Sequence, residues 1–205
     1  MAEQKKFETK LTKKAEAYVR DFLEENFSEK ICYHNLNHTL EVVEAAEIIG
    51  RGSGLNTDEL EIVTLAAWFH DIGYYIGKEN HEAESAKIAE KYLSTIKCSQ
   101  KVIQAVAGCI HATKIPQSPV NLVEEVLCDA DLYHLSTEKF FEKTELLREE
   151  MLAHEVDINR EKWLSTSCHF VTNHTYFTDF ARAHLRPKKI ENLAMLREKI
   201  GENKL

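Results

Sequence analysis

Glycine and proline are scarce in this chain, with 7 and 3 examples among 205 residues. These residues shape the tight turns that connect short strands, so their scarcity disfavours an architecture built from strands and turns. Hydrophobic residues make up 43% of the chain and charged residues 29%, which is enough apolar material for a core. We therefore expect a helical protein, and the length suits one domain or one domain with a small appendage.

An excess of positive charge is also missing. The formal net charge is −8, and no block of lysine and arginine stands out. Sequence-specific binding to nucleic acid is therefore not expected, since it depends on basic surfaces. An acidic protein that takes an anionic substrate needs local cations or a metal ion to attract it.

Long apolar runs and paired cysteines are absent as well. No apolar run approaches 18 residues, and no apolar segment opens the chain, so neither a membrane span nor a leader is expected. The 5 cysteines are odd in number, scattered and without a C-x-x-C pair, which is typical of reduced thiols in a cytoplasmic protein. They are Cys32, Cys98, Cys109, Cys128 and Cys168.

Apolar residues recur at helical spacing along most of the chain, without an internal repeat or a linker. The predicted helices cover residues 7–27, 38–49, 58–72, 81–95, 99–112, 120–132, 137–154, 159–183 and 187–200, and the segment 159–183 is either one helix or two. We expect Asn37 and Thr57 to cap the second and third helices, and Gly73 to terminate the third. The pattern predicts a single all-α domain.

The third predicted helix is apolar nearly all round from Ile62, and it ends in His70-Asp71. A buried imidazole beside a buried carboxylate loses hydration without compensation unless it finds a partner. A divalent metal ion is one such partner, because it accepts nitrogen and oxygen ligands together. One His-Asp pair carries little weight alone, so the case depends on the rest of the chain.

Other ligand-type side chains also fall at the ends of predicted helices. They are His38, His81, His111, Asp129 and Asp131. A helical bundle gathers such ends into one pocket, where metal sites are commonly built. Imidazoles and carboxylates without thiolates suit Mn, Fe, Co, Ni or Mg better than a structural zinc site of the cysteine type.

The order His38, His70-Asp71 and Asp131 resembles the H…HD…D pattern of the HD-domain superfamily of metal-dependent phosphohydrolases. The resemblance covers about residues 30–135, and residues 136–205 read as extra C-terminal helices. The local segments that also match are residues 33–38, 68–73, 81–86 and 129–132. The resemblance implies an all-α helical bundle of the HD-domain type.

The resemblance also implies a set of ligands. His38, His70, Asp71 and Asp131 correspond to the ligands of one metal, and Asp131 fits the family position better than Asp129. Two-metal members carry extra histidines where this chain has His81 and His111, and Asp71 would then bridge the metals. The expected cofactor is one or two divalent ions, either Mn, Fe, Co, Ni, Mg or Zn.

Position 74 departs from the family pattern. One-metal members often have there a glutamate that acts in proton transfer, whereas this chain has Tyr74. The nearest acids are Glu79 and Glu82, and we expect Glu82 to act in catalysis together with His70 and Asp71.

Two further side chains are expected to contact the substrate. Lys114 follows the fifth predicted helix and could bind a phosphate group. His34 precedes the second helix and could donate a hydrogen bond beside the ligands.

The leading hypothesis is hydrolysis of a phosphoester of a nucleotide or other small phosphorylated metabolite, by water that the metal activates. Two alternatives stay open. One is a sensor or regulatory module that binds metal and nucleotide without turnover, and the other is a di-iron oxygenase on the same scaffold. Nothing in the sequence reads a base or a sugar, and the oligomeric state is left open.

Overall fold

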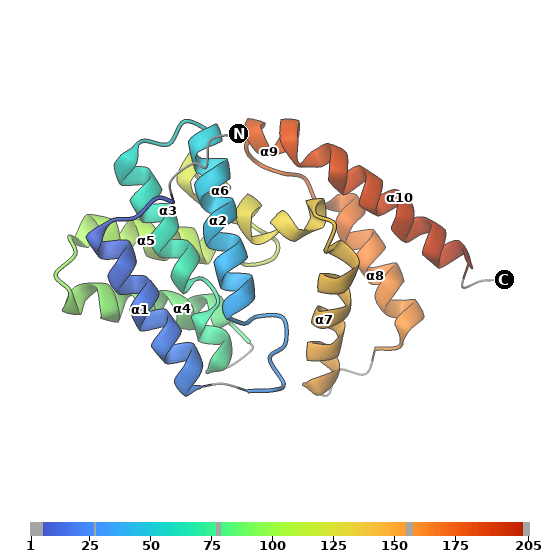
Figure 1. Cartoon of the computed structure of the whole chain (residues 1–205), viewed down its shortest axis with the longest axis horizontal. Helices are drawn as coiled ribbons and strands as arrows, with labels where there is room; N and C mark the ends of the chain where they lie inside the picture. Colours follow the sequence, from blue (N-terminus) through green and yellow to red (C-terminus); the bar gives the residue numbers. More distant parts are fainter. Residues whose placement is uncertain (1–5, 27, 77–78, 155–157, 203–205) are drawn as a thin grey trace. The chain divides into compact units, whose positions relative to one another are not determined.

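The structure is a computed structural model that describes residues 6–26, 28–76, 79–154 and 158–202. Over these residues the chain consists of helices joined by short connections, as Figure 1 shows. The predicted all-α fold is thereby confirmed. None of the described helices is both long enough and apolar enough to span a bilayer.

The chain divides into two compact units. The first comprises residues 1–27 and 34–131, and the second comprises residues 28–33 and 132–205. The helices of the first unit are α1 (Lys10–Glu25), α2 (Leu36–Gly52), α3 (Thr57–Phe69), η1 (Ile72–Tyr75), α4 (His81–Thr95), α5 (Gln100–Ala112) and α6 (Leu122–Asp131).

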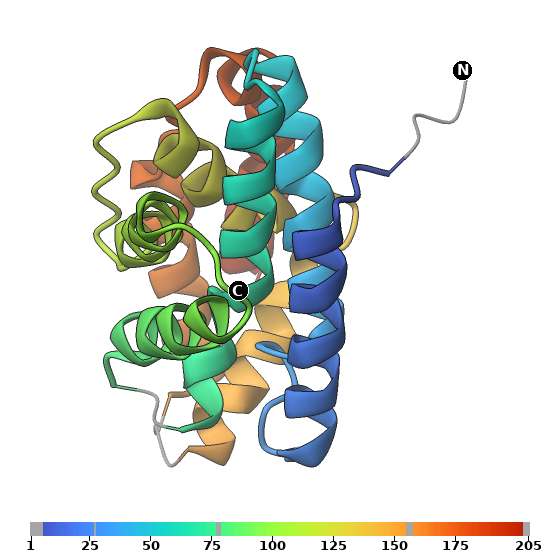
Figure 2. The same cartoon turned by 90° about the vertical axis from the view of Figure 1, so that its left-hand side faces the viewer.

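Helix α3 forms the centre of the first unit. Every residue from Val63 to Phe69 is buried, as the run of apolar residues predicts. The helix packs against α1, α2, α5 and α6, and Figure 2 shows α2 and α3 side by side. The residues directly after α3 therefore lie in the interior of the unit.

Two helices begin earlier than predicted. Asn56, not Thr57, caps α3, and Asn35, not Asn37, caps α2. The Asn35 side chain accepts hydrogen bonds from the backbone N–H groups of Asn37 and His38, which is the geometry of an N-cap. Because α2 starts at residue 36, His38 lies in its first turn with a fixed backbone.

Gly73 does not terminate a helix as predicted, but lies inside the 3-10 turn η1. A Cβ atom built on it would lie 2.3 Å from the carbonyl oxygen of His81 and 2.5 Å from the amide nitrogen of Ser85. The Gly73 N–H also donates to Ser85 Oγ at 2.8 Å. The missing side chain thus lets the start of α4 pack directly on η1.

The second unit has its own apolar core, formed by Leu132, Leu135, Phe140, Leu164, Val171 and Leu196. Its helices are η2 (Tyr133–Ser136), α7 (Phe140–Ala153), α8 (Arg160–Asn173), α9 (Asp179–His184) and α10 (Arg186–Glu202). The segment 159–183 is therefore two helices. His174 adopts an extended backbone after α8, and buried Lys189 donates to the carbonyl oxygens of Val171 and His174.

Candidate metal centre

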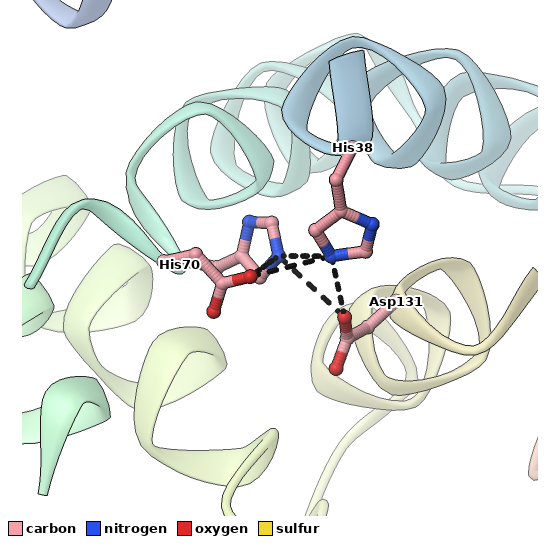
Figure 3. Close-up of side chains that lie close together, drawn as sticks. His38, His70 and Asp131 are labelled. Atoms are coloured by element: carbon pink, nitrogen blue, oxygen red, sulfur yellow. Dashed lines mark hydrogen bonds and ion pairs between the residues drawn. The ribbon is translucent and has the colours of Figure 1, made fainter. Parts of the chain in front are cut away.

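Four side chains of the first unit converge on one point (Figure 3). His38 comes from the first turn of α2, His70 directly follows α3, Asp71 precedes η1, and Asp131 ends α6. One ligand atom from each lies within 4.8 Å of all the others. We call these four side chains the cluster.

The atoms that face one another are the Nε2 atoms of both histidines and one oxygen of each carboxylate. His38 Nε2 lies 3.2 Å from Asp71 Oδ2 and 3.3 Å from Asp131 Oδ1. His70 Nε2 lies 3.0 Å and 3.5 Å from the same two oxygens. The two nitrogens are 3.3 Å apart.

A backbone carbonyl fixes the tautomer of His70. Its Nδ1 lies 2.9 Å from the oxygen of Ala67, one turn earlier along the chain. A carbonyl oxygen only accepts, so Nδ1 carries the hydrogen, and in the neutral ring Nε2 presents its lone pair to the cluster. Metal-binding histidines are held in this way by a partner of the second ring nitrogen.

Asp71 Oδ2 provides a further test of the fit to a metal. The atom is buried and has no hydrogen-bond partner among the described residues, although both imidazoles lie close to it. A buried carboxylate oxygen without such a partner is costly. A divalent ion bound at the cluster would satisfy this oxygen and the His70 lone pair together, and the donor set of two nitrogens and two oxygens fits such an ion.

The electrostatics of the cluster favour positive charge. Burial alone would raise the pKa of Asp71, but the charge of His70 and the close contacts with the neighbouring imidazoles hold it well below its usual value. Burial would likewise lower the pKa of His70, yet the Asp71 charge and contacts to both carboxylates raise it well above 6.5. The carboxylates therefore stay charged, and protons compete with a metal ion for the imidazoles.

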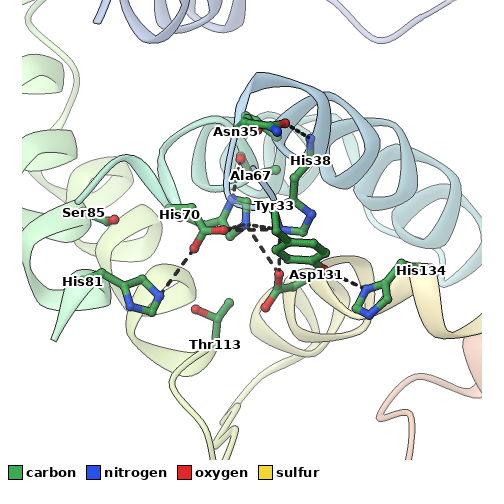
Figure 4. Close-up of polar contacts among 12 residues, drawn as sticks. Tyr33, Asn35, His38, Ala67, His70, His81, Ser85, Thr113, Asp131 and His134 are labelled. Carbon is green, nitrogen blue, oxygen red and sulfur yellow. Dashed lines mark hydrogen bonds and ion pairs between the residues drawn. The ribbon is translucent and has the colours of Figure 1, made fainter. Parts of the chain in front are cut away.

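His81 and Glu82 lie beside the cluster, at the start of α4. His81, labelled in Figure 4, has its Nε2 atom 3.5 Å from Asp71 Oδ1, whereas His38 and His70 lie close to the other oxygen, Oδ2. Glu82 is buried, and its Oε1 lies 3.7 Å from the same nitrogen. His81 is not one of the four clustered ligands.

The structure also brings His34 close to the ligands. Its ring stacks on the ring of Tyr74, with centroids 4.1 Å apart and an angle of 18° between the planes. The same ring lies 5.9 Å from that of His38 and 6.1 Å from that of His81.

Three other candidates are not brought into the cluster. His111 was predicted as a ligand but its side chain is exposed, because the buried side of α5 carries Ile110 and its neighbours. Lys114 is also exposed, and its Nζ donates to Asn80 Oδ1 at 2.9 Å. Asp129 is fully buried on α6 but outside the cluster.

Thr113 was not among the residues predicted for the site. It is buried just after α5, where its hydroxyl donates to the carbonyl oxygen of Ile110 at 2.8 Å. Figure 4 shows its side chain between His81 and Asp131 in this view. The only signal in the sequence was its position two residues after His111.

A family model for the HD domain matches residues 35–136, a stretch that contains all four clustered ligands. The chain is thus an HD-domain protein. Together with the geometry of the cluster, the match indicates that the chain resembles hydrolases that bind a divalent metal ion.

Solved structures share the fold over nearly the whole chain. A protein described as a predicted HD superfamily hydrolase, from an uncultured Thermotogales bacterium, has a TM-score of 0.61 at 18% identity and covers 93% of this chain and 91% of its own. Proteins from Listeria innocua (0.65, 16% identity, 95% and 98% covered) and Lactobacillus plantarum (0.68, 15% identity, 97% of each chain covered) are also similar. At these identities the likeness concerns the fold alone.

One curated relative matches in sequence. It is an uncharacterized protein of Clostridium beijerinckii, 32% identical over 80 residues. The match covers 38% of this chain and spans about half of the relative, 50% of its length.

Proposed function

We propose that the protein is a metal-dependent phosphohydrolase that cleaves a phosphoester of a nucleotide or other small phosphorylated metabolite. The observation that carries the proposal is the buried cluster itself. The fixed lone pair of His70 and the unpartnered Asp71 Oδ2 face the same point as His38 and Asp131, which supports a divalent ion as their common partner.

A divalent ion bound there would supply Lewis acidity to water and to a phosphoryl oxygen. The chain's own side chains provide the orientation. The Ala67 carbonyl holds the His70 ring, and the cap at Asn35 holds the backbone of His38. Rigidly held donors need no rearrangement during the reaction, which is where such sites gain their catalytic power.

Substrate approaches from the side of Asp131 and His81, since these side chains are 19% and 21% exposed whereas His38 and His70 are 3% and 0% exposed. Glu82 lies on the same side, next to His81. We assign proton transfer to Glu82, acting through His81. Tyr74 occupies the position where the family pattern has a glutamate, and it has no carboxylate to perform this role.

The test combines metal analysis with a substrate panel. Elemental analysis of the purified protein counts and names the metals, and phosphate release is then measured from a panel of phosphoesters with added Mn, Co, Mg, Ni or Fe. We expect metal-dependent release that Asp71→Ala abolishes. Nucleotide binding without turnover would instead indicate a sensor module, and tightly bound iron that consumes O₂ would indicate an oxygenase.

A further inference from the structure

Tyr74 contacts two histidines that do not belong to the cluster. The His34 ring stacks on its face at 4.1 Å, and the His81 ring lies edge-on at 5.2 Å with an angle of 64° between the planes. Tyr74 is buried, so its ring is a fixed surface rather than a mobile side chain. One aromatic ring thus sets the position of two imidazoles that come from different parts of the chain.

Both imidazoles lie next to the ligands. His81 Nε2 is 3.5 Å from Asp71 Oδ1, and the centroids of the His34 and His38 rings are 5.9 Å apart. Both are only partly buried, in contrast to His38 and His70. They border the cluster on the side from which substrate can reach it.

The charges around the cluster show what an anionic substrate still needs. Two carboxylates and one divalent ion sum to zero charge, so the ion alone leaves no excess positive charge for a phosphate. Among the described residues, Asp71 and Asp131 form ion pairs only with histidines. The ammonium group of Lys114 donates a hydrogen bond to Asn80 instead. The imidazoles of His34 and His81 also lie beside the cluster and can carry N–H donors, and the Nε2 atom of His81 itself faces Asp71 Oδ1 and Glu82 Oε1.

We propose that Tyr74 holds His34 and His81 as a pair of imidazole donors that bind the phosphate group of the substrate beside the metal. The inference rests on the proposed phosphohydrolase function and assigns the substrate-binding side of that site. His34 and His81 touch the substrate, and Tyr74 is a positioning residue that acts through them.

The test measures inorganic phosphate binding by calorimetry on the Mn-loaded 205-residue chain, with metal content determined in parallel. For His34→Ala we expect phosphate affinity to fall about tenfold, equivalent to about 1.4 kcal/mol, with unchanged metal content. His81→Ala should behave alike. The matched control is His169→Ala, which removes an exposed histidine of the second unit and should change neither quantity.

The role of Tyr74 is tested by two substitutions at that position. Tyr74→Phe keeps the ring and should retain wild-type phosphate affinity, whereas Tyr74→Leu removes the contacts to both imidazoles and should weaken phosphate binding at least as much as His34→Ala. The double variant His34→Ala with Tyr74→Leu should bind phosphate no more weakly than Tyr74→Leu alone, because Tyr74→Leu already releases the His34 ring. In a phosphoester assay His34→Ala should raise KM while kcat changes little, whereas Tyr74→Leu, which also releases the His81 ring, should raise KM and lower kcat.

Several results would overturn the inference. Wild-type protein that binds no phosphate, or His34→Ala that binds it normally, would remove the proposed contact. Loss of metal in His81→Ala would make that histidine a ligand instead. Failure of the hydrolase proposal can be distinguished from failure of this inference, because phosphate binding is measured without turnover. If phosphate binding depends on His34 but the protein hydrolyses no phosphoester, the anion site stands and the hydrolase proposal fails.

Discussion

The Nε2 atoms of His38 and His70 lie 3.3 Å apart in the interior of the first unit. The hydrogen bond from His70 Nδ1 to Ala67 commits the His70 nitrogen to a lone pair in the neutral ring. Two nitrogens at this distance, both facing carboxylates, need a proton or a metal ion between them. A divalent ion bound here would thus stabilise the arrangement of the two histidines in addition to any part it takes in chemistry.

Removal of one nitrogen should therefore empty the site. His70→Ala is expected to reduce bound metal to background, because three remaining donors hold a divalent ion much more weakly than four. Elemental analysis measures this, and circular dichroism should show largely unchanged helical content. Full metal occupancy in His70→Ala would show that the cluster is not the metal site.

The two acids of α6 should differ sharply. Asp131 belongs to the cluster, whereas Asp129 is buried outside it. Metal content of Asp131→Asn should consequently fall well below that of Asp129→Asn, measured on proteins purified and loaded in the same way. The opposite order would mean that α6 presents the other acid to the metal.

His111 should prove dispensable for the metal. Its side chain is exposed on α5, away from the four convergent ligands. We expect His111→Ala to keep the wild-type number of metal ions per chain after saturation with Mn or Fe. A variant that loses half of its metal would restore His111 as a ligand of a second ion.

Gly73→Ala should destabilise the protein by about 1–3 kcal/mol, because a Cβ atom there would collide with the backbone of His81 and Ser85. Since α4 must shift to relieve the collision, His81 moves relative to Asp71 and phosphate binding weakens. The matched control is Gly201→Ala, whose Cβ meets nothing within 4 Å. Urea unfolding of both variants measures the difference, and equal stabilities would contradict the tight packing of α4 on η1.

A pH effect is expected from the second unit. Burial, and secondarily the charge of Lys189, lowers the pKa of His174 from 6.5 to about 4. Between these values the unfolded chain binds more protons than the folded one, so this contribution to stability is complete above pH 6.5 and is lost as the pH falls toward 4. It amounts to about 3 kcal/mol at most.

The measurement is the free energy of unfolding in urea at several values between pH 7.5 and 4. His174→Gln removes the titrating group, so its stability should fall less steeply with decreasing pH than that of the wild type. Parallel pH profiles for the two proteins would mean that His174 is solvated and titrates normally.

Much of the site could be predicted from the sequence because each ligand lies in a short, recognisable stretch of residues. Apolar periodicity identified most of the helices, and the spaced motif identified His38, His70, Asp71 and Asp131, which the structure brings together. Helix starts were displaced by up to three residues. At α2 the reason is that Asn35 and Asn37 are equally good caps by residue type.

The remaining features depend on how helices are rotated and packed. Successive helix residues turn by about 100°, so His111 and Thr113 point to nearly opposite sides, and the sequence does not say which side faces the cluster. The structure buries Thr113 and exposes His111. Likewise, the stack of His34 on Tyr74 joins residues 40 positions apart, which periodicity alone cannot reveal.

Asp131 is both the last of the four ligands along the chain and the last residue of the first unit. During synthesis, the ribosome therefore releases the complete ligand set only after every helix of that unit has been made. Before this point the nascent chain offers only part of a site, and the metal has little to bind. A metal ion held by all four ligands would therefore bind only after the whole unit has been synthesised, and its binding free energy would stabilise the complete unit rather than a part of it.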